Sequence, residues 1–202
     1  MRSLFYLPVM AVVLALAPAS TGCSRCARDL SRYDVLKDPR ISQKPKQKMI
    51  VVELKGDPSE VGGQAFKKLF KTYWGLKKKV KGMESEAPRA RWPSALDTPK
   101  DKWIGIYGLP VPDEVEELPE SDGEGPEVRL EHWEYGETAE ILHVGPYSGE
   151  TPSIEKLHAF IEERGYEIAG PHEEEYLKGP GMFFKGNPDK YKTIIRYPVK
   201  KK

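Results

Sequence analysis

The stretch of sequence that decides the fold is "LHVGPYSGETPSIEKLHAFIEERGY", residues 142–166. It begins as a β-like run, turns at a Gly-Pro-Tyr corner and continues as an amphipathic helix, in which Ile154, Leu157 and Ile161 form one apolar stripe. Because proline holds φ near about −65°, the corner turns the chain sharply away from its strand. The segment therefore predicts a strand followed directly by a helix that ends at Gly165.

A fainter version of this segment occurs earlier in the chain. Three pairs of anchors recur at nearly the same spacing: Gly56 and Gly145 are 89 residues apart, Gly75 and Gly165 are 90 apart, and Pro110 and Pro198 are 88 apart. Each pair stands at the same place in a strand–helix–strand pattern. The three pairs together indicate a duplicated unit.

Each copy of the unit is predicted to be a βαββ half. The first half contains the strand-like "MIVVEL", a helix that opens at Asp57-Pro58, and the strand-like "RARWPSAL" and "WIGIYGLPV". The second half contains "VRLEHWEYGETAEILHV", the helix of the opening stretch, "EEEYL" and "YKTIIRYPV". The predicted fold is an α+β domain with duplicated βαββ halves, an antiparallel sheet with two main helices packed on one face, and a groove between the halves. We place the first half at residues 49–111, an acidic linker at 112–127 and the second half at 128–200.

The charge of the chain gives no overall attraction to nucleic acid. The 202 residues carry a formal net charge of +1 at pH 7, although the charges are segregated. Residues 67–81 contain seven lysines and no acid, whereas residues 112–127 contain eight acids and no base. Such runs are typical of solvated surface, so we expect no nucleic-acid partner.

The N-terminal residues 1–22 are typical of an export signal. Arg2 supplies a short positive region, and the apolar core that follows is shorter than a membrane span of about 20 residues. The "STGC" that ends at Cys23 resembles the cleavage site of bacterial lipoproteins, although Ser20 departs from that pattern. We therefore expect a lipidated Cys23 and a membrane-anchored lipoprotein of the cell envelope. The alternatives are cleavage after Ala19, which gives a soluble secreted or periplasmic protein, and an uncleaved signal anchor.

Residues 23–48 are basic and poor in apolar side chains, which predicts a tether that leads to the domain, with a possible first strand from Ser31. A basic tether beside an anionic bilayer is attracted to it. Cys23 and Cys26 are the two cysteines of the chain and form a CxxC pair, but a tetrahedral zinc site needs four ligands. We expect no metal site.

The motifs "HVGPYSG", "EEEYL" and "TIIRYPV" together resemble those of the GyrI-like family, also called the AraC-type effector-binding domain. The resemblance covers essentially the whole domain, and the related SOUL haem-binding family shares the duplicated architecture. It implies two pseudo-symmetric halves that hold a small apolar or cationic molecule between aromatic side chains and a carboxylate. Many members are the sensor halves of transcription regulators. Since this chain has no helix-turn-helix and carries an export signal, only ligand binding is transferred to it.

The resemblance also assigns roles to single residues. Tyr147 matches the tyrosine of the Gly-Pro-Tyr corner, Tyr176 matches that of the fourth-strand motif, and Glu174 matches an acidic position two residues before it. Ile194 stands where the family often has a carboxylate. In drug-binding members this acid is expected to meet a cation, so its loss argues against cation binding and against acid-assisted hydrolysis.

The residue types themselves add three ligand-binding candidates. Trp103 and Tyr107 lie four residues apart, on one face of a strand, and flat rings stack on planar ligands. His143 precedes the corner and is positioned to hydrogen-bond a ligand or to ligate haem, or else to be satisfied by its neighbours. His158 is the alternative axial ligand in a SOUL-like interpretation. We expect no cofactor, with haem as the alternative.

The sequence therefore predicts an exported, membrane-anchored and non-catalytic domain that binds a small apolar or aromatic molecule. Its ligand-binding residues are Trp103, Tyr107, His143, Tyr147, Glu174 and Tyr176. One alternative is a membrane-tethered module that binds a protein partner. Another is a hydrolase of small strained compounds, in which Glu174 and Tyr176 act as base and acid.

Overall fold

The computed structural model describes residues 29–93, 98–120, 123–180 and 186–202. The export signal, Cys23 and Cys26 lie outside these residues. The first half of the domain consists of β2 (Gln47–Lys55), α1 (Pro58–Lys79), β3 (Arg89–Trp92), η2 (Lys100–Lys102) and β4 (Ile104–Pro110). The second half consists of β5 (Arg129–Trp133), β6 (Gly136–Val144), η3 (Tyr147–Gly149), α2 (Thr151–Glu163), β7 (Tyr166–Ile168), β8 (His172–Lys178), η4 (Pro188–Lys190) and β9 (Lys192–Lys201). Two further elements, η1 (Ser31–Lys37) and β1 (Arg40–Lys44), precede the first half.

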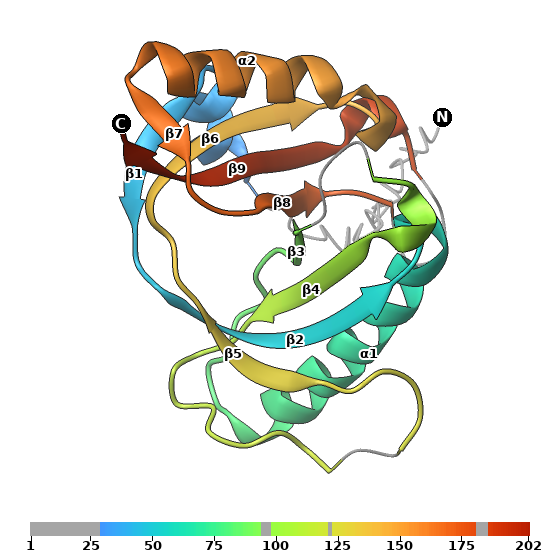
Figure 1. The fold of residues 1–202 in the computed structure, drawn as a ribbon. Helices are drawn as coiled ribbons and strands as arrows, with labels where there is room; N and C mark the ends of the chain where they lie inside the picture. Colours follow the sequence, from blue (N-terminus) through green and yellow to red (C-terminus); the bar gives the residue numbers. More distant parts are fainter. Residues whose placement is uncertain (1–28, 94–97, 121–122, 181–185) are drawn as a thin grey trace, which may run out of the picture.

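The strands form one curled antiparallel sheet in the order β1-β6-β9-β8-β3-β4-β2-β5, and β7 adds to β9. The central pairing of β3 with β8 joins the two halves. Figure 1 shows α2 over the strands of the second half and α1 beside β2 and β4 of the first, both on the outer side of the curl. The predicted α+β architecture is therefore confirmed.

Two glycines mark the duplication. Gly56, directly after β2, has φ +139°, and Gly145, directly after β6, has φ +144°. This is a conformation that side-chain-bearing residues rarely adopt. Both glycines stand where a strand turns into a helical segment, so the first pair of sequence anchors has the same structural role in the two halves.

The first helix is longer than the repeat predicts. Asp57 caps α1 by accepting a hydrogen bond from the Ser59 amide at 2.8 Å, but the helix continues beyond Gly75 to Lys79. The expected equivalence of Gly75 with the helix-ending Gly165 is therefore wrong. The absence of a side chain at Gly75 serves packing instead, since a Cβ there would lie only 3.0 Å from Pro119 of the acidic linker.

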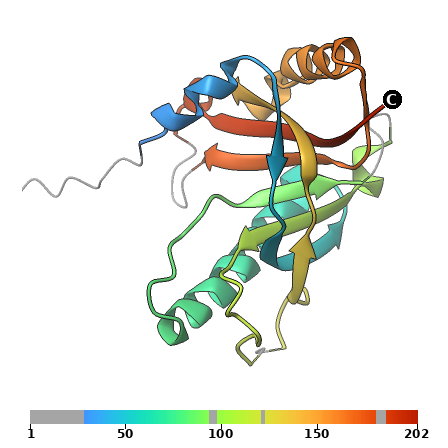
Figure 2. The same cartoon turned by 90° about the vertical axis from the view of Figure 1, so that its left-hand side faces the viewer.

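The residues before the first half are folded rather than a free tether. Ser31–Lys37 is a 3-10 helix, not a strand, and its Leu36 packs with Leu142 and Ile194. Strand β1 pairs with β6 of the second half. Its polar composition hid it in the sequence, because Ser42 and Lys44 face a buried charge, Glu140, at 3.5 and 3.0 Å. Figure 2 shows β1 and η1 lying along the strands of the second half.

The sheet face opposite the helices holds a buried ionic network. Arg196 of β9, which is 2% exposed, contacts Glu173 at 2.9 Å, Glu175 at 2.6 Å and Glu140 at 3.0 Å. Arg91 of β3 binds Glu173 at 2.7 Å. The network therefore links β3, β8, β9 and β6 across the junction of the halves.

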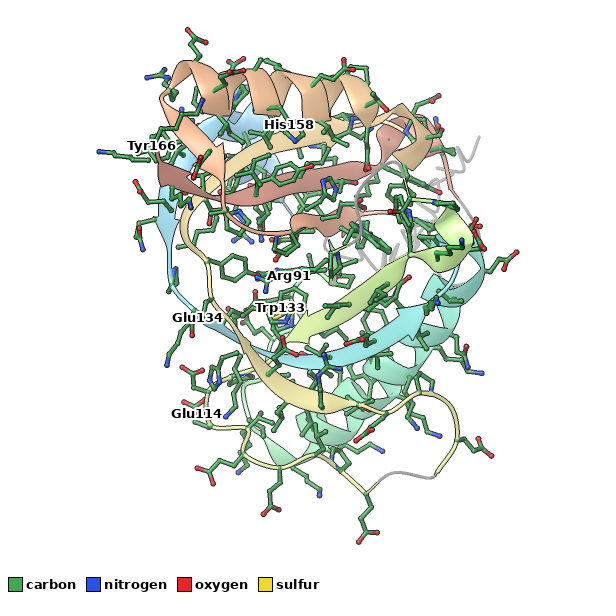
Figure 3. All side chains as sticks on the ribbon, in the orientation of Figure 1. Arg91, Glu114, Trp133, Glu134, His158 and Tyr166 are labelled. Carbon is green, nitrogen blue, oxygen red and sulfur yellow. The ribbon has the colours of Figure 1, made fainter. Side chains whose placement is uncertain are left out.

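Two aromatic residues complete this network. The Arg91 guanidinium stacks on Trp133 with 4.0 Å to the ring centroid, as Figure 3 shows in the middle of the curl. The Tyr135 hydroxyl accepts a hydrogen bond from Arg89 at 2.7 Å and donates one to Glu173 at 3.0 Å. Almost every charge in the network thus has a partner at close range, which buried charges require.

Replacing Arg196 by Met is expected to lower the free energy of unfolding by about 3–5 kcal/mol, because Glu173 and Glu175 would remain buried without their common partner. The matched control is Arg129→Met. Arg129 also lies on a strand and pairs with Glu53 at 3.2 Å, but both side chains are more than 40% exposed. That substitution is expected to cost about 1 kcal/mol or less. Urea denaturation measures both, and equal effects would contradict the assigned role of the network.

Candidate functional site

A row of aromatic rings crosses the junction of the two halves on the helix-bearing face of the sheet. It starts at Trp103, which lies 5.5 Å from Trp92 between ring centroids, and Trp92 lies 5.6 Å from Tyr107. Phe66 of α1 connects the halves, with 5.3 Å to Tyr107 and 5.8 Å to Tyr176. We call this set of rings, with the two that follow, the aromatic row.

The second half contributes the other end of the row. Tyr147 lies 5.6 Å from Tyr176 and 5.5 Å from Tyr191. Tyr107, inside the row, is 2% exposed, whereas Trp103 at the first-half end is partly buried and Tyr147 is 39% exposed. The middle of the row is therefore buried, and Tyr147 is its exposed edge.

A carboxylate lies beside the middle of the row. Oε1 of Glu174 accepts hydrogen bonds from Trp92 Nε1 at 3.0 Å and from His172 Nε2 at 3.0 Å. The register of β3 and β8 explains this contact, because Trp92 stands opposite His172 and Ala90 opposite Glu174. Side chains of alternate residues share a face, so His172, Glu174 and Tyr176 all point toward the row.

His172 is held in turn by Tyr197 of β9. Its Nδ1 lies 2.7 Å from the Tyr197 hydroxyl. The tautomer with its proton on Nε2 satisfies both contacts, since it donates to Glu174 and accepts from Tyr197. Tyr197 also contacts the ring of His158 on α2, at 4.9 Å between centroids. Through His172, these contacts fix the orientation of the Glu174 carboxylate.

A second carboxyl group, Glu150, is buried near Glu174. It is the N-cap residue of α2, yet its side chain makes no capping hydrogen bond and is only 7% exposed as a residue. Burial, followed by the neighbouring Glu174 carboxylate, raises the pKa of Glu150 to about 9, and the Thr193 hydroxyl offsets part of this rise. Glu150 is therefore protonated at neutral pH.

The hydroxyl groups of the row are held in their neutral form. Burial raises the pKa of Tyr107 to about 12 and raises that of Tyr176 well above its ordinary value, in both cases helped by the Glu174 charge. The site thus offers one carboxylate, one neutral carboxylic acid and neutral phenols in an aromatic surrounding. This arrangement can bind a flat molecule and can also donate or accept a proton.

The structure brings five of the six predicted ligand-binding residues together. Trp103, Tyr107, Tyr147, Glu174 and Tyr176 belong to the aromatic row or to its carboxylate. His143 has a different place, because Ser153 lies 3.1 Å from its Nδ1 and the Pro146 carbonyl 3.2 Å from its Nε2. Both ring nitrogens are engaged, and they fasten the Gly-Pro-Tyr corner to α2.

Sequence reasoning missed four members of the site: Phe66, Trp92, His172 and Glu150. Trp92 is 5% exposed, and its indole N–H also orients Glu174. An acid at the start of the second helix was the available signal for Glu150. Ile194, the position of the family's carboxylate, packs with Leu36 and Leu142 and faces away from the row.

Two surface hollows lie away from the aromatic row. One, of about 380 Å³, lies between α1 and the acidic linker and is lined by Lys68, Lys71 and Leu118 among others. The other, of about 790 Å³, lies between β1 and the end of α2 and is lined by Arg40, Phe160 and Tyr166 among others. Within the described ranges no group of three or more metal-ligating side chains converges, and no helix there is long and apolar enough to cross a membrane.

The sequence of residues 37–200 matches the model of the GyrI-like small molecule binding domain. The chain belongs to this family. Two solved structures from Listeria innocua are similar to it: a conserved protein of 28% identity and a hydrolase of 25% identity, each with a TM-score of 0.68. The matches cover 81% of this chain and 93% and 92% of theirs.

The EcmrR C-terminal domain, at 16% identity and a TM-score of 0.58, shares the fold; that match covers 82% of this GyrI-like chain and 98% of the EcmrR domain. No curated protein sequence matches the chain.

The raised pKa of Glu150 predicts a pH-dependent stability. In the unfolded chain this carboxyl ionises near pH 4.3, so between about pH 4.5 and 9 the folded state holds a proton that the unfolded state has released. The free energy of unfolding should therefore fall as pH rises through this window, by up to about 1.4 kcal/mol per pH unit.

Glu150→Gln is expected to remove this slope, so the variant should become more stable than the wild type as pH rises from 5 to 9. Chemical denaturation at a series of pH values measures the difference. Glu155→Gln, on the exposed face of the same helix, is the control and should follow the wild type. A Glu150→Gln curve parallel to the wild-type curve would show that Glu150 ionises normally.

Proposed function

We propose that this GyrI-like protein is an exported, membrane-anchored domain that binds a small aromatic molecule against the aromatic row. The observation that carries the proposal is the row itself: rings from both halves lie edge to face around a carboxylate that is oriented by Trp92 and His172. Aromatic surfaces with a few well-placed polar groups are typical of small-molecule sites. The family supports ligand binding as the general role.

The membrane anchor is proposed from the N-terminal sequence. Residues 1–22 are typical of an export signal, and Cys23 follows "STG" as a lipidation site. The folded elements begin with η1 at Ser31, which leaves only a few residues between Cys23 and the domain. Lipidation of Cys23 would therefore hold the domain close to the bilayer surface.

Hydrolysis is a second candidate function, and the two carboxyls favour it. Glu174 accepts two N–H hydrogen bonds, which orient a carboxylate that could act as a base toward water, whereas protonated Glu150 is suited to act as an acid. The similar Listeria innocua protein described as a hydrolase keeps this candidate open. If the protein hydrolyses a bound compound, and both Glu174→Gln and Glu150→Gln abolish this hydrolysis, the function is catalysis and not binding alone.

A protein-binding role is the remaining alternative. The open hollow between β1 and α2, lined partly by charged residues, would be the place for such a partner. The aromatic row favours a small molecule instead, because its rings gather edge to face around one carboxylate and most are at least partly buried. A domain that carries no ligand but retains a protein through this hollow would favour the alternative.

Purified residues 27–202 are expected to carry a small molecule that native mass spectrometry detects as added mass. Trp103→Ala and Tyr147→Ala, at the two ends of the row, should each remove or weaken this ligand by roughly tenfold or more, since each deletes an aromatic contact worth about 1.5 kcal/mol. Trp74→Ala is the control, because Trp74 is 51% exposed on the outer side of α1. Loss of the ligand in the control alone would contradict the proposed site, and a Soret band would indicate haem.

Cys23→Ser is expected to abolish lipidation, so the mature domain should leave the membrane fraction or persist as unprocessed precursor. Fractionation with mass analysis of the N-terminus measures this. Cys26→Ser is the matched control and should remain lipidated and anchored. Wild-type protein cut after Ala19 would contradict the lipoprotein anchor.

A further inference from the structure

Glu174 already accepts several hydrogen bonds from the protein. Its Oε1 accepts from both Trp92 and His172, and the neighbouring Tyr176 hydroxyl also interacts with this carboxylate. The side chain is only 13% exposed. A ligand that enters beside it would meet a carboxylate whose negative charge is already shared among protein donors.

The polar atoms near the row that lack a hydrogen-bond partner are hydroxyl and carboxyl oxygens, not the Oε1 atom of Glu174. Among the described residues, the buried atoms without a hydrogen-bond partner include the Tyr107 hydroxyl, Oε1 of Glu150 and the hydroxyl of Thr193 beside Glu150. Tyr107 and Glu150 are 2% and 7% exposed. Since Glu150 is protonated, both groups can donate an O–H. A buried donor without a partner is destabilising, and an acceptor supplied by a ligand would relieve this.

We infer that the ligand of this site is an uncharged, flat aromatic compound whose edge carries a hydrogen-bond acceptor, such as a ketone or amide carbonyl oxygen. This inference rests on the proposed function and specifies the chemistry of its ligand. The rings of the row would cover the flat faces, and the unpartnered O–H groups would bind the acceptor. A site built to hydrogen-bond one polar group rejects an analogue that lacks it.

The groups that surround Glu150 offer a cation only one charged partner. They are Tyr147 from η3, Glu174 and Tyr176 from β8, and Thr193 from β9. All of these except Glu174 are uncharged, and burial, helped by repulsion from Glu174, raises the pKa of Glu150 and keeps it neutral. A cation would have to remove a proton from Glu150 or displace donors from Glu174 before it gained a full counter-charge.

Two fluorescent probes with the same tricyclic frame separate these possibilities. Acridone is neutral and carries a carbonyl acceptor, whereas 9-aminoacridine is a cation at neutral pH. With residues 27–202, which contain every element of the described fold, acridone is expected to bind at least tenfold more tightly than 9-aminoacridine at pH 7. Fluorescence titration gives both affinities.

Tyr107→Phe removes one donor and is expected to weaken acridone binding five- to tenfold. Tyr73→Phe is the matched control, because its hydroxyl is also buried in the same core cluster, but it lies two turns farther along α1 than Phe66. This control should leave the acridone affinity unchanged. Thermal melting of both variants checks that each is folded.

The pH dependence has a defined sign. Acridone should bind more weakly to the wild type as pH rises from 7 to 10, because Glu150 then loses the proton that it donates. In Glu150→Gln the acridone affinity should be independent of pH over this range. An affinity that rises with pH, or a Glu150→Gln variant that keeps the wild-type slope, would contradict the role of Glu150.

The remaining outcomes decide between this inference and the proposed function. Preferred binding of 9-aminoacridine, with release of a proton, would overturn the inference and leave a small-molecule site in place. Binding of acridone that Trp103→Ala and Tyr147→Ala do not weaken would place the ligand elsewhere and overturn both. Binding of neither probe, together with no co-purifying mass, would reject the proposed function and the inference with it.

Discussion

The pairing of β3 with β8 is the contact on which the rest of the structure depends. It joins the two copies of the βαββ unit in the middle of the sheet, whereas β2 and β5 join them at its edge, and it has two very different faces. Because side chains alternate along a strand, Arg91 and Glu173 point to one face while Trp92 and Glu174 point to the other. A slip of one residue would exchange the faces and bury the wrong groups on both.

The ionic face fixes this register. Arg196 reaches Glu173 and Glu175 on β8 and Glu140 on β6, while Arg91 reaches Glu173 from β3. Burying charges is costly unless each one finds its partners, so a shifted register would leave several unpaired. The network therefore acts mainly as a selector of one alignment of the halves, and that alignment is what places rings from both halves in a single row.

On the helix-bearing face, the same alignment of the halves places two carboxyl groups in different surroundings. Glu174 and Glu150 are both carboxyls, but their surroundings differ. Glu174 accepts N–H groups from Trp92 and His172, whereas Glu150 has an apolar and like-charged environment that keeps its proton. Glu150 stands at the N-cap position of α2, shortly after the Gly-Pro-Tyr corner. His143 fastens this corner to α2.

Local patterns in the sequence determined the elements of this protein. The apolar stripe of the second helix, the Asp57-Pro58 start of the first and the paired glycines at 56 and 145 are properties of short segments, and the structure has them in the predicted places. The family motifs also pointed to Tyr147, Glu174 and Tyr176 as neighbours.

The tertiary structure alone decided which distant residues meet. Strand β1 was hidden in the sequence because its polar side chains serve a buried charge on another strand, and α1 passes Gly75 because the linker packs there. The orientation of Glu174 depends on Trp92, which is 82 residues away in the chain, and the protonated state of Glu150 depends on burial and on Glu174 of another element. Periodicity records which face a residue occupies in its own element, but it carries no information about the partner that another element brings to that face.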